Sequence, residues 1–322
     1  MRLLIISIFI SILNTVQAQS IYTSYRDQFI LRSSIGYNSA PFQIKGKFNG
    51  IDEKLKYRAN MNAVLGLGLS YKWFSLGFRL GLTGYVKDTA SYGKTNYFDV
   101  DLDFNIKKWY CSMDLHAYEG FSLQDAIRFN DSLSSNGTPN FIKPALRSLS
   151  LGLCTYRFFN QEFNMKAGLG VVSRYHRNIH SFYLKFSSNL YGIADNEGLL
   201  PYSFLSDTRS IVQSNNFAAF DFGVIPGFGN FIKIENWQVG GLLGVGAMIQ
   251  TKFYTTDSMT RGFIGLAPRY DLRIIGGYNV ENWFCMLDLQ FDNKSIRFND
   301  IGYHQNYYYI RLLTGYRFKN RD

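Results

Sequence analysis

The sequence predicts an all-β fold, a transmembrane antiparallel up-and-down β-barrel of about 12 strands, with a range of 10–14. Three observations predict it. Apolar and polar residues alternate over stretches longer than soluble strands, which average about five or six residues. Phenylalanine (28) and tyrosine (23) are abundant, whereas prolines number only six. All four tryptophans stand where a long alternating stretch begins after a very short connection.

The first residues predict a secretory signal peptide over residues 1–18. Arg2 precedes an apolar run from Leu3 to Leu13, and Val16-Gln17-Ala18 ends in a small residue. A basic start, a short apolar run and a cleavage site are typical of such peptides. A membrane-anchoring helix would need roughly 20 apolar residues. We therefore expect residues 19–322 to form one exported barrel in the cell outer membrane.

The composition also limits the partners. The chain has a formal net charge of +10 and a pI near 9.3. Export argues against nucleic acid, so outer-membrane lipid, lipopolysaccharide phosphate or an acidic solute suits this charge better. Three cysteines without framework spacing argue against a disulfide-built fold and a thiolate metal site. Since no histidine has ligand spacing either, we expect no metal and no cofactor.

The first alternations run from Leu55 to Tyr71 and from Phe74 to Leu82, with apolar residues at every second position. Membrane β-strands need about 9–11 residues, and all their backbone groups must pair, which a closed barrel achieves. Similar stretches are predicted as strands at 28–38, 95–107, 109–119, 147–158, 163–176, 216–230, 237–253, 262–278, 283–298 and 306–318.

The tryptophans indicate which end of the barrel faces the periplasm. Tryptophan prefers the membrane–water boundary, and outer-membrane barrels have short periplasmic turns beside an aromatic girdle. The alternative is a soluble sandwich with the tryptophans in its core. The longer polar connections, 120–146 and 177–215, are then the extracellular loops. The predicted girdle consists of Trp73, Trp109, Trp237, Trp283, Tyr316 and Phe318.

An even number of strands follows if both chain ends lie in the periplasm. The stretches up to residue 176 and those from residue 216 together give twelve, with 177–215 as one outer loop. The short alternation at 181–186 keeps fourteen open, because it would need another strand near 201–213. Alternating aromatic residues from Tyr308 to Phe318 form a closing strand, which makes barrel-insertion machinery an expected partner. We expect a monomer.

Several segments are similar to a known family. They are YRDQFILR (25–32), GLGLSYKWFSLGF (66–78), GKTNYFDVDL (93–102), YEGF (118–121) and GGYNVENWF (276–284). In this order, over nearly the whole mature chain, they resemble the domain-of-unknown-function family 4421, uncharacterised outer-membrane barrels of Gram-negative bacteria. The resemblance implies the barrel fold and transfers no catalytic residues.

The hairpin YFDVDLDFNIKKWYCSMDLHAY (97–118) concentrates charge on one face. A turn at Lys107-Lys108 places Asp99 opposite His116, Asp101 opposite Asp114, and Asp103 opposite Ser112. The apolar residues between them must face lipid, because a charge there costs about 2–4 kcal/mol near the midplane. The acidic set therefore faces the lumen, where Asp101 and Asp114 repel each other unless a cation lies near.

Arg79 and Arg58, on the preceding stretches, are the predicted neutralising cations. A structural charge network is one interpretation of this cluster, because charges inside membrane proteins usually pair. An ion or solute site is a second. A hydrolase using Ser112, Asp114 and His116 is a third, although alternate residues of one strand stand roughly 6–7 Å apart.

A second hairpin around Val280-Glu281 predicts further lumen ion pairs. The turn places Arg273 opposite Asp288, Arg269 opposite Asp292, and Asp271 opposite Gln290. Opposite charges facing each other across a hairpin stabilise it by roughly 0.2–1 kcal/mol.

We expect a non-enzymatic barrel, a narrow channel or a surface scaffold with a charged lumen. The alternatives are a barrel enzyme acting on lipid or peptide, and a barrel that binds a protein or glycan through loops 120–146 and 177–215.

Overall fold

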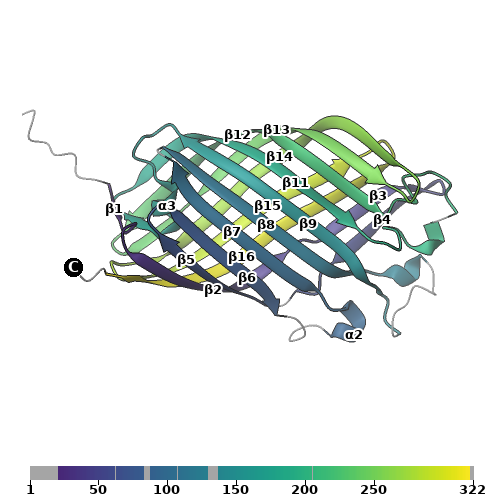
Figure 1. The fold of residues 1–322 in the computed structure, drawn as a ribbon, viewed down its shortest axis with the longest axis horizontal. Coiled ribbons are helices and arrows are strands. Elements are labelled where there is room, and N and C mark those ends of the chain that lie inside the picture. The colour runs from purple at the N-terminus through teal and green to yellow at the C-terminus, as the bar shows by residue number, and fades with distance from the viewer. Residues whose placement is uncertain are drawn as a thin grey trace, which may run out of the picture.

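The structure is a computed structural model that describes residues 21–319 except 62, 83–87, 107, 130–136 and 205. The predicted signal peptide, residues 1–18, lies outside the described residues. Twelve antiparallel strands form a closed ring, as predicted (Figure 1). No helix in the described ranges is long and apolar enough to cross a membrane. Around the ring the strands are β2 (Phe29–Ser39), β5 (Ala63–Tyr71), β6 (Phe74–Leu82), β7 (Asn96–Ile106), β8 (Trp109–Leu123), β9 (Phe141–Phe158), β11 (Ile179–Ala194), β12 (Asn216–Ile234), β13 (Trp237–Thr255), β14 (Thr260–Asn279), β15 (Trp283–Arg297) and β16 (Ile301–Phe318).

The alternation of the sequence decides which side chains face out. On β12, Phe220 and Phe222 are 42% and 48% exposed, whereas Asp221 between them is fully buried. The last strand behaves as predicted: Ile310, Leu312, Tyr316 and Phe318 face outward, and Tyr307, Tyr309 and Arg317 are buried inside. β16 closes the ring by pairing with β2, so both chain ends lie at the same end of the barrel.

The tryptophans mark that same end, called the tryptophan end below. Trp237 pairs with Tyr278, and Trp283 pairs with Tyr316. Trp73, Trp109, Trp237 and Trp283 are 62%, 36%, 55% and 46% exposed. Tyr316 pairs with Trp283, and the ring of Phe318 lies 5.0 Å from that of Tyr316. The structure therefore assembles the predicted ring of aromatic residues, and its contact with a membrane boundary stays a prediction.

The number of strands is right, but one member of the predicted set is wrong. Residues 163–176 form no barrel strand. They contain α3 (Met165–Leu169) and β10 (Ser173–Tyr175), which pairs with β1 (Tyr22–Ser24). The missing strand is β11, inside the predicted outer loop 177–215, and residues 201–213 add no strand among those described. β11 pairs with β9 and β12 along its length because its alternate residues are apolar.

The predicted strand 55–71 is also wrong in its extent. The strand is interrupted after β4 (Ile51–Arg58). After Ile51, the exposed side chains are even-numbered on β4 but odd-numbered on β5. Leu55 and Tyr57 are fully buried, whereas Leu65 and Leu67 on β5 are 45% and 68% exposed. β4 forms a hairpin with β3 (Phe42–Phe48) that bridges β16 and β8 at the far end of the barrel. The remaining short elements are α2 (Thr89–Tyr92), η1 (Ala126–Arg128) and η3 (Tyr202–Phe204).

Two apolar clusters close the lumen. The inner plug fills the tryptophan end, where residues 163–175 and the chain start at Ile21–Tyr25 pack against β11, β12 and β15. The outer cap fills the far end, where the β3–β4 hairpin packs against the loop 195–215. Leu199, Leu200 and Val212 of that loop are at most 3% exposed. The predicted outer loop is therefore partly a strand and partly a lid.

Candidate functional site

A network of charged side chains fills the lumen between the inner plug and the outer cap. It begins on β7, where alternate residues Asp99, Asp101 and Asp103 face inward, as the lipid-avoidance argument predicts. The predicted register of the first hairpin is confirmed: Asp99 pairs with His116, Asp101 with Asp114, and Asp103 with Ser112.

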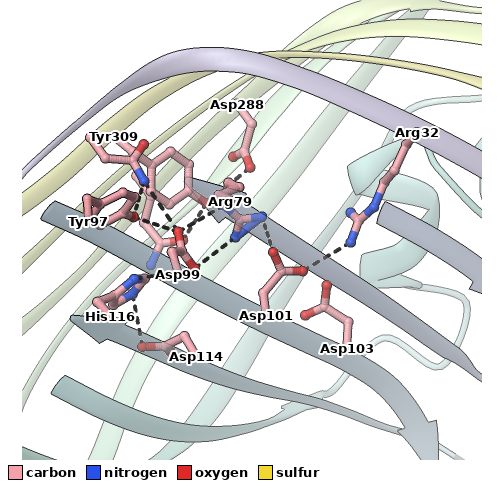
Figure 2. Close-up of polar contacts among 12 residues, drawn as sticks. Arg32, Arg79, Tyr97, Asp99, Asp101, Asp103, Asp114, His116, Asp288 and Tyr309 are labelled. Carbon is pink, nitrogen blue, oxygen red and sulfur yellow. Dashed lines mark hydrogen bonds and ion pairs between the residues drawn. The ribbon is translucent and has the colours of Figure 1, made fainter. Parts of the chain in front are cut away.

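Arg79 on β6 neutralises two of these carboxylates (Figure 2). Its Nε lies 2.8 Å from Asp99 Oδ2, and its Nη2 donates to Asp99 Oδ1 at 3.3 Å. Its Nη1 forms a further ion pair with Asp101. Asp99 is fully buried and Arg79 is 6% exposed, so bulk water does not solvate either charge in place of its partner. Arg79 therefore fulfils its predicted role.

Arg58 does not take part, which corrects the second predicted cation. It lies on β4 in the outer cap region, where its side chain is exposed. The partner that replaces it is Arg32 on β2, whose Nη2 lies 3.0 Å from Asp101 Oδ2. Sequence reasoning missed Arg32 because it lies three strands away from β7 and reaches Asp101 across the glycines Gly68 and Gly77 of β5 and β6. Asp103 accepts a 2.7 Å hydrogen bond from the hydroxyl of Tyr110.

His116 contacts Asp114, one of the two like charges that face each other across the hairpin, and also Asp99. Its Nε2 lies 3.2 Å from Asp114 Oδ2, and its Nδ1 lies 3.4 Å from Asp99 Oδ1. Its ring also lies against Tyr307, with 4.3 Å between ring centroids. Asp114 therefore turns to the histidine while Asp101 turns to two arginines, which relieves the repulsion that the sequence predicted.

Glycines leave room for the two carboxylates. A Cβ on Gly77 would lie 2.6 Å from Asp101 Oδ1, and one on Gly152 would lie 2.7 Å from Asp114 Oδ1. Both distances are too short for any side chain without displacement of the carboxylate. The network thus depends on small residues of the neighbouring strands β6 and β9 as well as on charge.

The second predicted hairpin register is wrong by two residues. Arg273 pairs with Gln290, and Asp288 pairs with Ile275. The turn is longer than predicted, because the Val280 N–H donates to the Trp283 carbonyl (3.1 Å), which moves the centre of the turn by one residue.

The ion pair between Arg273 and Asp288 nevertheless forms, at 2.8 Å, because a long side chain reaches a diagonal neighbour. Arg269 lies 3.6 Å from Asp292, as a weaker contact, and forms its closer ion pair with Asp221 of β12. Asp271 does not contact Gln290: it receives hydrogen bonds from Lys185 (2.9 Å) and Tyr183 (2.7 Å) of β11. These partners were missed because β11 was assigned to a loop.

A small cavity lies in the middle of the network, with a volume of about 90 Å³. Its charged lining includes Arg32, Arg79, Asp101, Asp103 and Arg311. The Arg311 guanidinium stacks on Tyr309, 3.3 Å from the ring centroid. The space suits a few water molecules, about 30 Å³ each, rather than a metabolite.

The carboxylates of this network are held by cations rather than arranged around a vacant centre. Among the residues that the structure describes, no three His, Cys, Asp or Glu side chains are placed to hold a metal ion. In the same ranges no hydrogen bond joins Ser112 to His116, so the three residues of the hydrolase interpretation do not form a connected triad.

The family model for "Domain of unknown function (DUF4421)" matches residues 20–318. The chain belongs to the DUF4421 family. None of the curated proteins compared with this DUF4421 protein matches it. The outer membrane protease OmpT from Escherichia coli is similar at a TM-score of 0.42 and 9% identity, over 92% of this chain and 98% of that protease.

The translocator domain of the autotransporter NalP from Neisseria meningitidis is similar at a TM-score of 0.40 and 10% identity, over 97% of this chain and 94% of that domain. An outer membrane channel from Pseudomonas putida F1 is similar at a TM-score of 0.34 and 8% identity, over 90% of this chain and 96% of that channel. A protease, a translocator and a channel share this likeness, which carries no argument about the activity of the DUF4421 chain.

Proposed function

We propose that this DUF4421 protein is an outer-membrane barrel that is closed at rest and acts as a surface scaffold, without conducting ions or catalysing a reaction. One observation carries the proposal: packed apolar side chains fill both ends of the lumen, with a neutralised charge network between them. Porins, in contrast, keep a water-filled polar channel.

A buried arginine is one of the residues that hold the inner plug, together with Gln238 and Asn279. Arg317 is fully buried and donates hydrogen bonds to the carbonyl oxygens of Gly170 (2.6 Å) and Val171 (2.9 Å) and to Asn279 Oδ1 (2.8 Å). Gly170 has a φ of +74°, which turns the chain so that its carbonyl faces the guanidinium. Withdrawing the plug would remove two of the carbonyl acceptors of a buried charge, which is costly.

The outer cap is held by a separate set of contacts. Lys143 on β9 lies 2.7 Å from Asp195 and donates a 2.5 Å hydrogen bond to the Gly198 carbonyl. The Tyr57 hydroxyl donates to the Leu199 carbonyl at 2.8 Å. The contacts of Lys143 and Tyr57 both hold the loop 195–215 against inward-facing side chains, so this loop is not presented to a partner.

The chemistry of the network supports a structural role. Each carboxylate of the β7–β8 hairpin has a hydrogen-bonding or ionic partner, and His116 is 5% exposed. A catalytic histidine needs a reacting group within hydrogen-bond reach, and both imidazole nitrogens here face carboxylates. The cavity within the network, at about 90 Å³, leaves no space for a lipid or peptide substrate.

Planar-bilayer recording together with sugar uptake into proteoliposomes tests the proposal. A heat-modifiable gel shift first verifies that the protein is folded and inserted. We expect the wild-type barrel to pass no steady current. The matched control combines Arg317→Ala with Lys143→Ala and should leak, because it releases both seals. A steady wild-type current would overturn the closed scaffold, and lipid or peptide hydrolysis abolished by His116→Ala would favour the enzyme.

A further inference from the structure

The barrel wall is only half paired between β14 and β15. Residues 272–279 of β14 pair with residues 284–291 of β15. Beyond that point residues 260–271 pair with β13 alone, and residues 292–297 pair with β16 alone. β14 therefore has an edge without a neighbouring strand over residues 260–271, called the open edge below. It lies in the half of β14 remote from the tryptophan end.

A proline and an asparagine mark where the pairing stops. The Asn293 side chain accepts a hydrogen bond from the Tyr270 N–H (3.0 Å) and donates one to the Pro268 carbonyl (3.2 Å). These two contacts show that even-numbered residues of β14 direct their backbone groups toward the β15 side, because directions alternate along a strand. Pro268 has no N–H on this side, so a regular ladder to β15 cannot continue past it.

Between Thr260 and Pro268, three residues of the open edge have backbone N–H and carbonyl groups that no strand pairs with. Gly262, Ile264 and Leu266 point their N–H and carbonyl groups toward the missing neighbour, and no strand of the described chain pairs with them there. The side chains of Ile264 and Leu266 are 79% and 77% exposed, more than any other large apolar side chain described. A strand beside them would cover both their backbone and their side chains.

Packed side chains separate the open edge from the lumen. Behind it, the Lys252 Nζ donates to the Arg297 carbonyl, and the rings of Phe263 and Phe298 lie 5.7 Å apart. Ile296 and Phe298 at the top of β15 are at most 5% exposed, so this part of β15 packs inward on the outer cap. The feature is therefore an exposed edge on the outside of the barrel and not a lateral gate.

The height of the open edge limits what can bind to it. From Tyr278 beside Trp237 to Leu266 the strand rises by about twelve residues, roughly 40 Å along its axis and ~28 Å across the membrane at a tilt of about 45°. Leu266 thus lies near the outer boundary of the hydrocarbon layer, and Ile264 and Gly262 lie beyond it. Lipid tails could cover the side chains here but could not pair with the backbone groups.

We infer that the open edge is a docking site for an extended segment of another protein, which adds to β14 as a further strand. Unpaired strand edges bind extended chains through main-chain hydrogen bonds, while alternate side chains give specificity. The exposed Arg261 and Arg297 flank the edge, and neither has an ion pair within the described residues. The preferred segment therefore alternates apolar residues and carries acidic residues at its ends.

This inference deepens the scaffold role proposed above and rests on it for its biological meaning. The two can fail separately, however. A barrel that conducts ions yet binds an extended peptide would overturn the closed scaffold alone, whereas a closed barrel that binds no such peptide would overturn only the docking site.

Hydrogen exchange of the full-length protein in nanodiscs provides the first test. The amides of Gly262, Ile264 and Leu266 should exchange at least about tenfold faster than those of Phe263 and Gly265, which pair with β13. Adding a synthetic peptide of alternating valine and threonine with glutamates at both ends should slow the three fast amides. Equal protection of all five amides without peptide would show that β15 closes the edge and would overturn the inference.

Two substitutions of Leu266 distinguish the binding of a peptide strand from coverage of the edge by lipid. Leu266→Pro removes one edge N–H without touching the β13 ladder, and it should weaken peptide binding about tenfold, the equivalent of one lost hydrogen bond. Leu266→Ala keeps the N–H and should bind nearly as well as wild type. The control peptide has N-methyl groups on alternate amides and should not bind. Equal binding by wild type and Leu266→Pro, or by both peptides, would also overturn the inference.

Discussion

Replacement of Arg79 by methionine should destabilise the barrel more than any single surface change. Methionine fills similar space but leaves the fully buried Asp99 and its neighbour Asp101 without their shared cation. Removing one partner of a buried ion pair costs about 3–5 kcal/mol, because the remaining charge stays buried. In the variant, Asp99 still accepts a 2.7 Å hydrogen bond from the Tyr97 hydroxyl. We therefore expect a loss of stability in the lower half of the range of about 3–5 kcal/mol.

A double-mutant cycle distinguishes this explanation from simple loss of packing. In the variant that combines Arg79→Met with Asp99→Asn, the unpaired carboxylate is gone, so the double variant should be more stable than the sum of the single effects by roughly 2 kcal/mol. Urea unfolding in detergent, followed by tryptophan fluorescence and by the gel shift of the folded barrel, measures the free energies of unfolding.

Arg128→Met is the matched control for that cycle. Arg128 forms a 3.0 Å ion pair with Glu53, but its side chain is 50% exposed, and exposed pairs contribute about 0–1 kcal/mol. The reasoning would be refuted if Arg79→Met cost less than about 1 kcal/mol, as an exposed pair does. Strict additivity in the cycle would equally show that the charges do not act together.

Three further predictions concern the two seals. Arg317→Ala should leave the barrel folded but speed hydrogen exchange across residues 163–175, because the plug loses its buried guanidinium; unchanged exchange would contradict the anchoring role. Tyr57→Phe should lower the free energy of unfolding by about 1 kcal/mol, since the Leu199 carbonyl loses its buried donor, and a neutral effect in urea unfolding would count against that tie. Burial, with Arg174 and Lys233 nearby, lowers the pKa of His176 in the inner plug. Its stabilising contribution is thus present above the unfolded pKa near 6.5 and is lost as the pH falls through the lower folded value. The protection of the β1–β10 amides, measured relative to their intrinsic exchange rates at each pH, should fall toward pH 5 in wild type but not in His176→Gln.

Local rules predicted the parts of the fold that depend on neighbouring residues. The β7–β8 register followed from one tight turn, and the inward direction of Asp99, Asp101 and Asp103 followed from the need to keep charge out of lipid. The segment 163–176 failed because apolar and polar residues alternate there too, although they pack as a plug. Two signals could have shown this: the Asn164 side chain accepts from the Lys166 N–H (3.0 Å) as a helix N-cap, and Gly170 with its positive φ ends the helix.

The cations of the network could not be predicted in the same way. Arg311 lies on β16, which meets β2 only where the barrel closes. Arg32 lies on β2, three strands before β7 in the sheet. Nothing in the sequence near Asp101 indicates that Arg32 will lie 3.0 Å away. A hairpin register fixes pairs within one turn, whereas a partner three strands away depends on every register in between, and an unpredicted interruption such as the one between β4 and β5 obscures it.

This difference in range explains why the hairpin carries an excess of negative charge. Asp99, Asp101, Asp103 and Asp114 lie on β7 and β8, but the guanidinium groups that neutralise them come from β6 and from β2 at the seam of the ring. Alone, the β7–β8 hairpin would hold four carboxylates with only His116 among them, which opposes its burial in a membrane. Once β2, β5, β6 and β7 pair in order, Arg79 lies beside Asp99, and Arg32 lies over Asp101 in one register row with Gly68 and Gly77. Neutralisation of the hairpin therefore follows from pairing of these four strands and not from closure of the ring, so that weakening Arg32 should destabilise this part of the sheet, whereas a change on the lipid-facing side of the same hairpin should not.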